Sequence, residues 1–246
     1  MPRTRITTAN VLSSLSPQQA DECLATVLAG DPDIVGLQEW RIMRLRGLAR
    51  TGSVGVAGVP RLRTGSGAYT WVTSGPGDCV VGLRASRFTV LATRQVSLGT
   101  VGHADRGSRI LDLLPPRWVS VVEAEDHLTA QRLGIVSYHL IPGTQGNDVY
   151  RADRPRNARR HQQEVRRLQR VVSRLLRRCD AVCALGDSNF HGLALPPLHS
   201  AWEGHPGTTG TLTSHRRIDD VFFTEPSRDV QLLRSHSDHA FVQVDY

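Results

Sequence analysis

The chain has 246 residues, of which 39% are hydrophobic and 22% charged, an ordinary composition for a globular protein that excludes wholesale disorder. No apolar run reaches the roughly 18 residues of a membrane-spanning helix, and the N-terminal residues lack the apolar core of a secretion signal. We therefore expect a cytoplasmic protein, with a single domain over residues 1–246 and no membrane span.

The positive charge is concentrated in one segment. All 30 basic residues are arginine and the formal net charge is +7. The absence of lysine excludes Schiff-base catalysis and the phosphate-binding lysine of P-loop proteins. Residues 151–178 contain eleven arginines and two acidic residues, so the rest of the chain is slightly negative. This segment, and not the whole surface, favours an anionic partner.

The N-terminal third of the chain predicts strand, helix, strand. Residues 5–12 predict a first strand that ends near Asn10. Ser16 and Pro17 then start a helix whose apolar residues recur every three or four positions until Gly30. The apolar run that follows predicts a buried strand.

The remaining elements are mostly short strands. The patterns predict a short helix at 41–50, strand pieces at 54–59 and 68–73, a hairpin at 79–98 and a loop at 99–116. Further along they predict strands at 117–124, 132–138, 181–186, 218–223 and 239–245 and one arginine-rich helix at 157–178. Many short strands and few helices indicate two packed sheets with helices outside, an α/β (α+β) fold class.

Five of these apolar runs carry a carboxylate, imidazole or amide at one end. They lie next to Glu39, His139, Asp187 with Asn189, Asp219, and Asp238 with His239. One such group for each strand suggests a single site at one edge of a sheet core. This pattern favours a metal-assisted hydrolase.

The residue types suit phosphoester hydrolysis. Glu39 and Asp238 offer hard oxygen ligands that Mg²⁺ or Mn²⁺ prefers. Asp187 can orient or deprotonate a water molecule, and Asn189 can bind that water or a phosphate oxygen.

The two histidines suit contact with a phosphate. His239 provides an imidazole that Asp219 can hold in one tautomer and keep charged. His139 can donate a hydrogen bond to a phosphate oxygen.

Six motifs, in this order, resemble the endonuclease/exonuclease/phosphatase superfamily, which includes pancreatic-type deoxyribonucleases, abasic-site endonucleases, inositol-phosphate phosphatases and bacterial sphingomyelinases. The motifs are Asn10-Val11, Gln38-Glu39, Ser137-Tyr138-His139-Leu140, Gly186-Asp187-Ser188-Asn189-Phe190, Arg217-Ile218-Asp219 and Ser237-Asp238-His239. The resemblance implies a four-layered αββα sandwich of two mostly antiparallel sheets and phosphoester cleavage that depends on a divalent metal.

The resemblance also implies roles for individual residues. Glu39 corresponds to the principal metal ligand, supported by Asn10, and Asp238 to a carboxylate on the metal side. Asp187 corresponds to the residue that positions the nucleophilic water, with Asn189 beside it. His239, paired with Asp219, corresponds to the histidine that contacts the scissile phosphate.

Two further positions bear on the branch of the superfamily and on the pocket. His139 matches the deoxyribonuclease and phosphatase branches better than the abasic endonucleases. Asp220 replaces an aromatic residue that commonly follows Arg-Ile-Asp, which predicts a pocket without one aromatic wall.

Each motif taken alone also has a purely structural interpretation. Gly-Asp-x-Asn is typical of a turn, His139 of a hydrogen-bonded core histidine, and Glu39 of a helix start. The order of six motifs along the chain, and not any one of them, supports an enzyme.

The basic segment leaves two interpretations open. The arginines of 157–178 can be the solvated face of a helix or can neutralise phosphates. Arg151, Arg154 and Arg156, in a predicted loop, are the stronger candidates for substrate contact. Trp202 can stack on a base or pack in the core.

The predicted function is a Mg²⁺-dependent nuclease that acts on DNA or RNA, assumed to be a monomer. One alternative is a phosphatase or phosphodiesterase acting on a small or lipid-linked phosphate. Another is a non-catalytic nucleic-acid-binding protein, which the retention of all the strand-end groups argues against.

Overall fold

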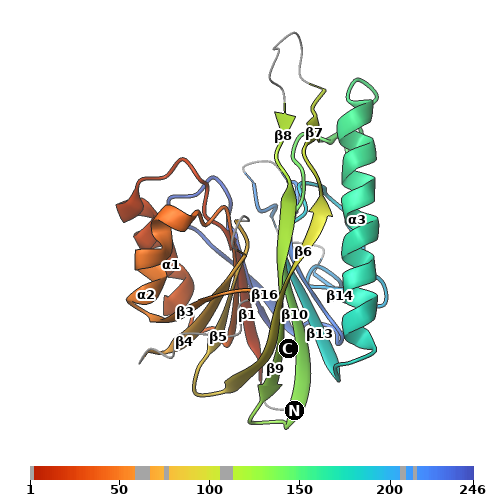
Figure 1. Cartoon of the computed structure of the whole chain (residues 1–246). Helices are drawn as coiled ribbons and strands as arrows, with labels where there is room; N and C mark the ends of the chain where they lie inside the picture. The colour runs from red at the N-terminus through yellow and green to blue at the C-terminus, as the bar shows by residue number, and fades with distance from the viewer. Residues whose placement is uncertain (1–2, 59–66, 75–77, 106–112, 206–208, 213–214) are drawn as a thin grey trace.

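A computed structural model describes residues 3–58, 67–74, 78–105, 113–205, 209–212 and 215–246. Two large sheets pack face to face, and helices cover their outer faces (Figure 1). The predicted fold class, two packed and mostly antiparallel sheets flanked by helices, is confirmed.

The first sheet has seven strands. In spatial order they are β16 (Asp229–Leu233), β17 (Phe241–Asp245), β1 (Arg5–Asn10), β2 (Ile34–Gln38), β5 (Val80–Arg84), β4 (Tyr69–Thr73) and β3 (Gly52–Val56). β1 runs parallel to β2 and β3 parallel to β4, and the other neighbours are antiparallel.

The second sheet has six strands. They are β14 (His199–Ser200), β15 (Asp219–Phe223), β13 (Ala181–Asp187), β10 (Gln131–His139), β9 (Arg117–Asp126) and β6 (Phe88–Gly99). β10 and β13 run parallel, and the other neighbours are antiparallel. Two small ribbons pair β7 (Gly102–His103) with β8 (Leu113–Leu114), and β11 (Gln145–Gly146) with β12 (Val149–Tyr150).

Three apolar layers hold the sheets and helices together. Residues such as Ile6, Ile135 and Leu185 form the core between the sheets. α1 (Pro17–Ala29) packs on the first sheet near α2 (Leu45–Ala49), which follows a 3₁₀ turn, η1 (Ile42–Arg44). α3 (Pro155–Leu176) packs on the second sheet. α1 begins as predicted, with a capping box between Ser16 and Gln19.

Some predicted elements are corrected. The hairpin at 79–98 is wrong, because β5 lies in the first sheet and β6 in the second. β5 is buried over most of its length and needs a neighbour on each side, whereas β6 is an edge strand. The last strand begins at Phe241, so His239 lies in the preceding loop. The short ribbon β7–β8 lies in the segment predicted as loop, of which 106–112 falls outside the described residues.

Strand direction brings the predicted site residues to one edge. The parallel strands β1 and β2, and likewise β10 and β13, end there. Their antiparallel neighbours β5, β9, β15 and β17 start there. Side chains from strand ends and from strand starts therefore meet.

At the opposite edge, the buried Arg87 links the two sheets. Its guanidinium donates two hydrogen bonds to Asp126, at 3.0 and 2.7 Å, and lies 2.8 Å from Asp33. Asp126 ends β9, and Asp33 precedes β2. Burial alone would raise the pKa of Asp126, but the hydrogen bonds from Arg87 lower it below its ordinary value.

We expect Arg87→Met to lower the free energy of unfolding by about 3–5 kcal/mol, because the substitution leaves Asp126 buried without its partner. Urea unfolding at neutral pH measures this loss. The lowered pKa means that the pair stabilises the fold fully above about pH 4, and that this contribution is lost as pH falls through the folded-state pKa. The deficit of the variant should therefore shrink near pH 3.

Arg50→Met is the matched control, because Arg50 pairs with Asp21 at the surface and both side chains are exposed. It should change the unfolding free energy by less than about 1 kcal/mol. Equal losses for the two variants would contradict a special role for the buried pair.

Candidate active site

A cavity of about 330 Å³ opens at the edge where the strand ends meet. Its lining is rich in charged and polar side chains. The lining residues are Leu12, Ser13, Glu39, Arg41, Asp78, Pro115, Arg117, His139, Pro142, Asp187, Asn189, Asp238 and His239. Both sheets contribute, so the site exists only when the two sheets are packed.

Asn10 holds two carboxylates from different sheets together. Its Nδ2 donates to Asp187 Oδ2 at 2.9 Å and to Glu39 Oε1 at 3.4 Å, while its Oδ1 accepts from the Leu12 amide. The Ser13 amide donates to Glu39 Oε2 at 2.7 Å. Burial alone would raise the pKa of Glu39, but a nearby histidine and the Ser13 amide hold it below its usual value. Glu39 is therefore a carboxylate, a form suited to binding a cation.

The loop after β13 is tightly folded. A Cβ at Gly186 would lie 1.9 Å from the Tyr138 carbonyl oxygen, so only glycine fits there. Asn189 donates from its backbone to Asp187 Oδ1 at 2.6 Å and from Nδ2 to the Leu140 carbonyl at 3.0 Å. Burial, and then the charge of Asp219, raise the pKa of Asp187. Asp187 is therefore a stronger base than an ordinary carboxylate.

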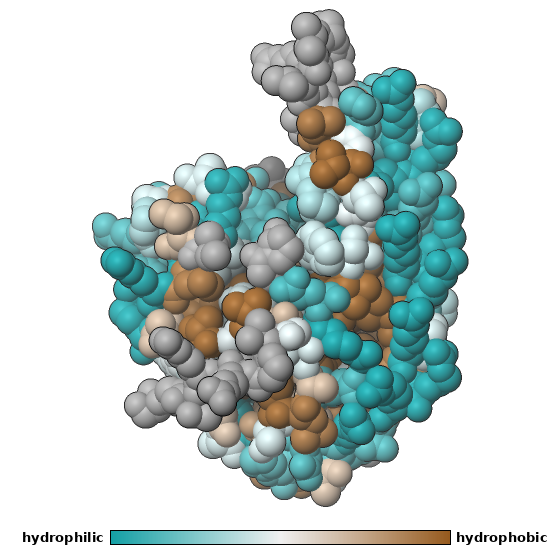
Figure 2. All heavy atoms as spheres, in the orientation of Figure 1, coloured by the Kyte–Doolittle hydropathy of each residue, from teal (hydrophilic) through white to brown (hydrophobic). Residues whose placement is uncertain are grey.

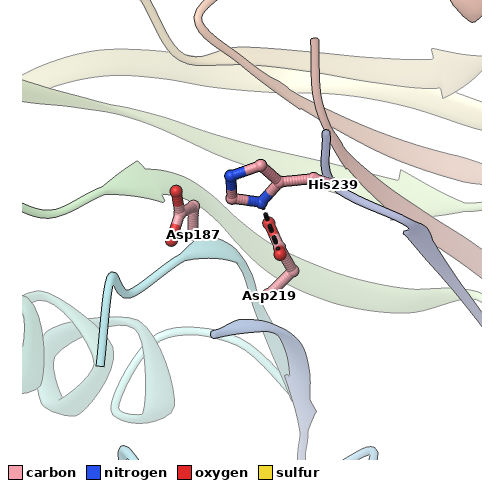
Figure 3. A group of neighbouring side chains, drawn as sticks. All are labelled: Asp187, Asp219 and His239. Carbon is pink, nitrogen blue, oxygen red and sulfur yellow. Dashed lines mark hydrogen bonds and ion pairs between the residues drawn. The ribbon is translucent and has the colours of Figure 1, made fainter. Parts of the chain in front are cut away.

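His239 and Asp219 form a buried pair. His239 Nδ1 lies 2.7 Å from Asp219 Oδ2 (Figure 3). Burial alone would lower the pKa of His239, but the charge and hydrogen bond of Asp219 raise it to about 10. Ligating atoms of these two residues and Asp187 lie within 4.8 Å of one another. The histidine is positively charged at neutral pH and suited to an anionic group.

His139 belongs to a second histidine–carboxylate pair. Its Nδ1 lies 3.0 Å from Asp78 Oδ2, and its Nε2 lies 3.6 Å from Asp187 Oδ2. Arg117 Nη1 lies 3.5 Å from the Asp78 carboxylate. Burial and the charge of Arg117 oppose protonation of His139, but Asp78 and Asp187 raise its pKa.

The sequence interpretation missed Asp78 and Arg117. Asp78 lies two residues before the first residue of β5, and Arg117 begins β9. Both strands run antiparallel to a strand that ends in the site. The sequence shows only an ionisable residue near the start of a strand. This indicates a site residue only when it is known which strand, ending in the site, lies antiparallel beside it.

Of two other residues predicted for the site, Asp238 and Trp202, only Asp238 lies at the cavity. Asp238 lines the cavity, and its side chain is 55% exposed. Trp202 does not line it. The indole of Trp202 packs against the core between the sheets and donates to the Asp219 carbonyl at 3.1 Å, which favours its packing role.

The predicted gap in the pocket wall at Asp220 is corrected. Successive residues of a strand face opposite sides, so Asp220 points away from Asp219 and from the cavity. Its carboxyl accepts from the Ser200 hydroxyl at 2.6 Å and the Ala201 amide at 3.1 Å. Burial, chiefly, raises the pKa of Asp220 to about 8.

The three arginines predicted to lie in a loop are outside the lining of the active-site cavity, and the loop prediction is wrong for Arg156, which belongs to the first turn of α3. Arg151 pairs with Asp153, and Arg154 donates to the Gly143 carbonyl at 3.3 Å. Arg156 lies 3.8 Å from Asp105 and lines a separate basic cavity.

The sequence from residue 7 to residue 239 matches the model of the endonuclease/exonuclease/phosphatase family. The chain belongs to this family. Members are hydrolases of phosphoester bonds and generally use divalent metals. A search of curated proteins finds no match to the chain.

Solved structures share the fold over almost the whole chain. An endonuclease/exonuclease/phosphatase protein from Bacteroides vulgatus has a TM-score of 0.71 at 15% identity, covering 100% of this chain and 98% of that one. D. rerio TDP2 complexed with a single-strand DNA product has a TM-score of 0.66 at 17% identity and covers 100% and 99%. A Bacteroides thetaiotaomicron mannosyl-6-phosphatase has a TM-score of 0.68 at 16% identity and covers 98% of each chain.

Two adjacent isosteric substitutions test the geometry of the site. Asp219→Asn removes the charge that holds His239, and we expect kcat for phosphoester cleavage to fall by about 100-fold or more. Asp220→Asn changes the neighbouring side chain, which faces away and at neutral pH carries a proton, so kcat should stay within about threefold. Steady-state kinetics measures both, with circular dichroism to check folding. An equal fall in kcat for the two variants would show that any change to a buried carboxyl at the start of β15 lowers activity. The direction in which the Asp219 side chain points would then have no special role.

Proposed function

We propose that residues 1–246 form one catalytic domain, a divalent-metal-dependent phosphoesterase that cleaves phosphodiester bonds of DNA or RNA. The observation that carries this proposal is the single cavity that collects Glu39, Asp187, Asn189 and two carboxylate-paired histidines. That the protein is cytoplasmic and that it is a monomer remain predictions from the sequence. Among the described residues, no helix combines the length and apolar character needed to cross a bilayer.

The donor set fits a hard divalent cation. Glu39 and Asp238 offer carboxylate oxygens at the cavity, and the buried Asp187 also lines it. Asp219 Oδ1 is buried without a hydrogen-bond partner among the described residues, so one of its oxygens can still accept a hydrogen bond or bind a cation. Oxygen-rich donors of this kind suit Mg²⁺ or Mn²⁺ better than softer ions, with Glu39 and Asp238 as the ligands and Asn10 holding the carboxylates in register. Such an ion would neutralise charge on the phosphate and on the leaving oxygen.

The other residues of the site act on water and phosphate. Asp187, whose pKa is raised, accepts a proton from the attacking water, and Asn189 fixes the Asp187 carboxylate through two hydrogen bonds. Asp219 occupies Nδ1 of His239, so Nε2, which lies 4.0 Å from Asp238 Oδ1, is the nitrogen that can donate to a phosphate oxygen. His139, held in the same way by Asp78, donates from the other sheet. Two histidine donors, one from each sheet, would therefore stabilise charge that develops on the phosphate.

A basic surface on α3 supports a nucleic acid as the substrate. The exposed face of α3 is hydrophilic along its length (Figure 2). Its one acidic residue, Glu164, is buried, so arginines dominate the exposed face. Arg156, Arg159 and Arg160 line a second cavity of about 420 Å³ beside the β7–β8 ribbon. Leu114 lines this basic cavity and the next residue, Pro115, lines the active-site cavity, so a polyanion can reach both.

A small phosphate ester is the second candidate substrate. The active-site cavity has room for one phosphate group and its substituent, and a mannosyl-6-phosphatase shares the fold. Neither observation requires the basic surface.

We expect the protein to cleave a single-stranded oligonucleotide and a plasmid in the presence of Mg²⁺ or Mn²⁺, and to lose this activity in excess chelator. Restoring the metal should restore the rate, because the chelator removes only the ion. A phosphomonoester such as mannose 6-phosphate serves as the comparison substrate. Preferential hydrolysis of the monoester would favour the second candidate, and cleavage that survives chelator would refute the metal requirement.

A pair of double variants tests the basic surface. Arg156→Gln with Arg159→Gln should weaken binding of an oligonucleotide and reduce the slope of log affinity against log salt by about 1.5, because two phosphate contacts are lost. Arg170→Gln with Arg174→Gln, two exposed arginines of α3 that do not line the basic cavity, should change the slope less. Fluorescence anisotropy at several salt concentrations measures both. Equal changes in slope would indicate diffuse attraction to the whole helix.

A further inference from the structure

The buried stripe of α3 changes character along its length. Its C-terminal half is apolar, with Leu168, Val172 and Leu175 against the second sheet. In its N-terminal half three of the four buried residues are polar and lie three or four residues apart, namely Asn157, His161 and Glu164; the fourth is Ala158. A buried polar group costs free energy unless it is hydrogen-bonded, so these residues are expected to have specific partners.

Each of the three has a backbone group of a loop among its partners. The Asn157 Oδ1 accepts from the Asp105 amide at 2.9 Å, and Glu164 Oε2 accepts from the Ile141 amide at 2.9 Å. His161 Nε2 lies 2.8 Å from the Ser188 carbonyl oxygen. The helix therefore holds loops as well as covering a sheet.

His161 is the central member of this set. It is completely buried, and its Nδ1 lies 2.9 Å from the Tyr150 hydroxyl. A carbonyl oxygen can only accept, so Nε2 carries the hydrogen and Nδ1 accepts from Tyr150. Phe190 packs against both rings, with centroids 5.2 Å from His161 and 4.5 Å from Tyr150. The imidazole has one orientation and one tautomer.

The carbonyl that His161 holds lies between two residues of the site. Ser188 separates Asp187 from Asn189, and Asn189 donates to the Leu140 carbonyl at 3.0 Å. The Leu140 amide in turn donates to the Asp187 carbonyl at 2.9 Å. Glu164 binds the residue after Leu140. α3 is thus bonded to both loops that meet at the Asp187 carboxylate.

We propose that His161 is a positioning residue for phosphoester cleavage, whose Nε2–H fixes the Ser188 carbonyl and so the direction of the Asp187 and Asn189 side chains. This inference rests on the proposed function, because it assumes that those two side chains act in the chemical step. An error of about 1 Å in placing such groups can reduce a rate about 100-fold without changing substrate affinity. The expected signature is a loss of kcat at a nearly constant KM.

Two substitutions of the same residue separate positioning from packing. In His161→Gln the side-chain amide nitrogen can take the place of Nε2 and donate to the Ser188 carbonyl, whereas the shorter side chain of His161→Asn cannot reach it. We expect kcat to fall about 100-fold in His161→Asn, with KM within about threefold. His161→Gln should keep at least about a third of the wild-type kcat.

Val172→Ala is the control for simple loss of stability, because Val172 is fully buried on the same helix face and its side chain offers no hydrogen bond. It should lower the midpoint of urea unfolding and leave kcat within about threefold. The substrates are bis(p-nitrophenyl) phosphate and a labelled oligonucleotide, each with Mg²⁺ or Mn²⁺.

A wild-type kcat in His161→Asn, or an equal loss in His161→Gln and His161→Asn, would overturn the inference. If His161→Asn does not fold, Tyr150→Phe decides instead, because it removes only the hydroxyl that orients the imidazole. A fall in kcat of about three- to tenfold at constant KM supports the inference, and an unchanged kcat overturns it. A wild-type protein inactive on both substrates would refute the proposed function itself, so the two failures are distinguishable.

Discussion

The burial of two neighbouring carboxylates, Asp187 and Asp219, is the constraint around which the active-site edge is built. Each is about 1% exposed, and a buried carboxylate is costly unless positive charge or hydrogen-bond donors are close. Burial and the charge of Asp219 raise the pKa of Asp187. The fold supplies these from several elements: His239 on Asp219, and Asn10, Asn189 and His139 around Asp187. Because these groups belong to both sheets, packing of the sheets and formation of the site are one event.

The same constraint explains why the two ends of the sandwich differ. At the edge away from the site, Arg87 forms hydrogen bonds or ion pairs with Asp126 and Asp33. The opposite charges there compensate each other within the protein and stabilise the fold. At the active-site edge, one oxygen of Asp219 has no partner among the described atoms. The carboxylates of Glu39, Asp187 and Asp238 line the open cavity at this edge, and negative charge beside an opening suits the binding of a cation.

α3 links the site to the surface. Its outer face carries arginines that suit a polyanion, and its inner face carries the side chains that hold the loops after β10 and β13. One residue shows both tasks, because Arg160 lines the basic cavity and also donates to the buried Glu164 at 2.6 Å. The helix is therefore more than a cover for the second sheet, although its apolar half does pack in that ordinary way.

The sequence by itself determined the class of fold and most of the chemical groups of the site. Strand-ending apolar runs and the order of the six motifs located Glu39, His139, Asp187 and His239, because residue type and strand periodicity are local properties. Only the tertiary structure decided which strand lies beside which. It separated β5 from β6, turned Asp220 away from the cavity, and brought Asp78 and Arg117 to His139 from strand starts that carry no local signal. It also revealed the task of His161, which the helical pattern presents as one buried position among many, because a hydrogen bond to a loop 27 residues away exists only after the chain has folded.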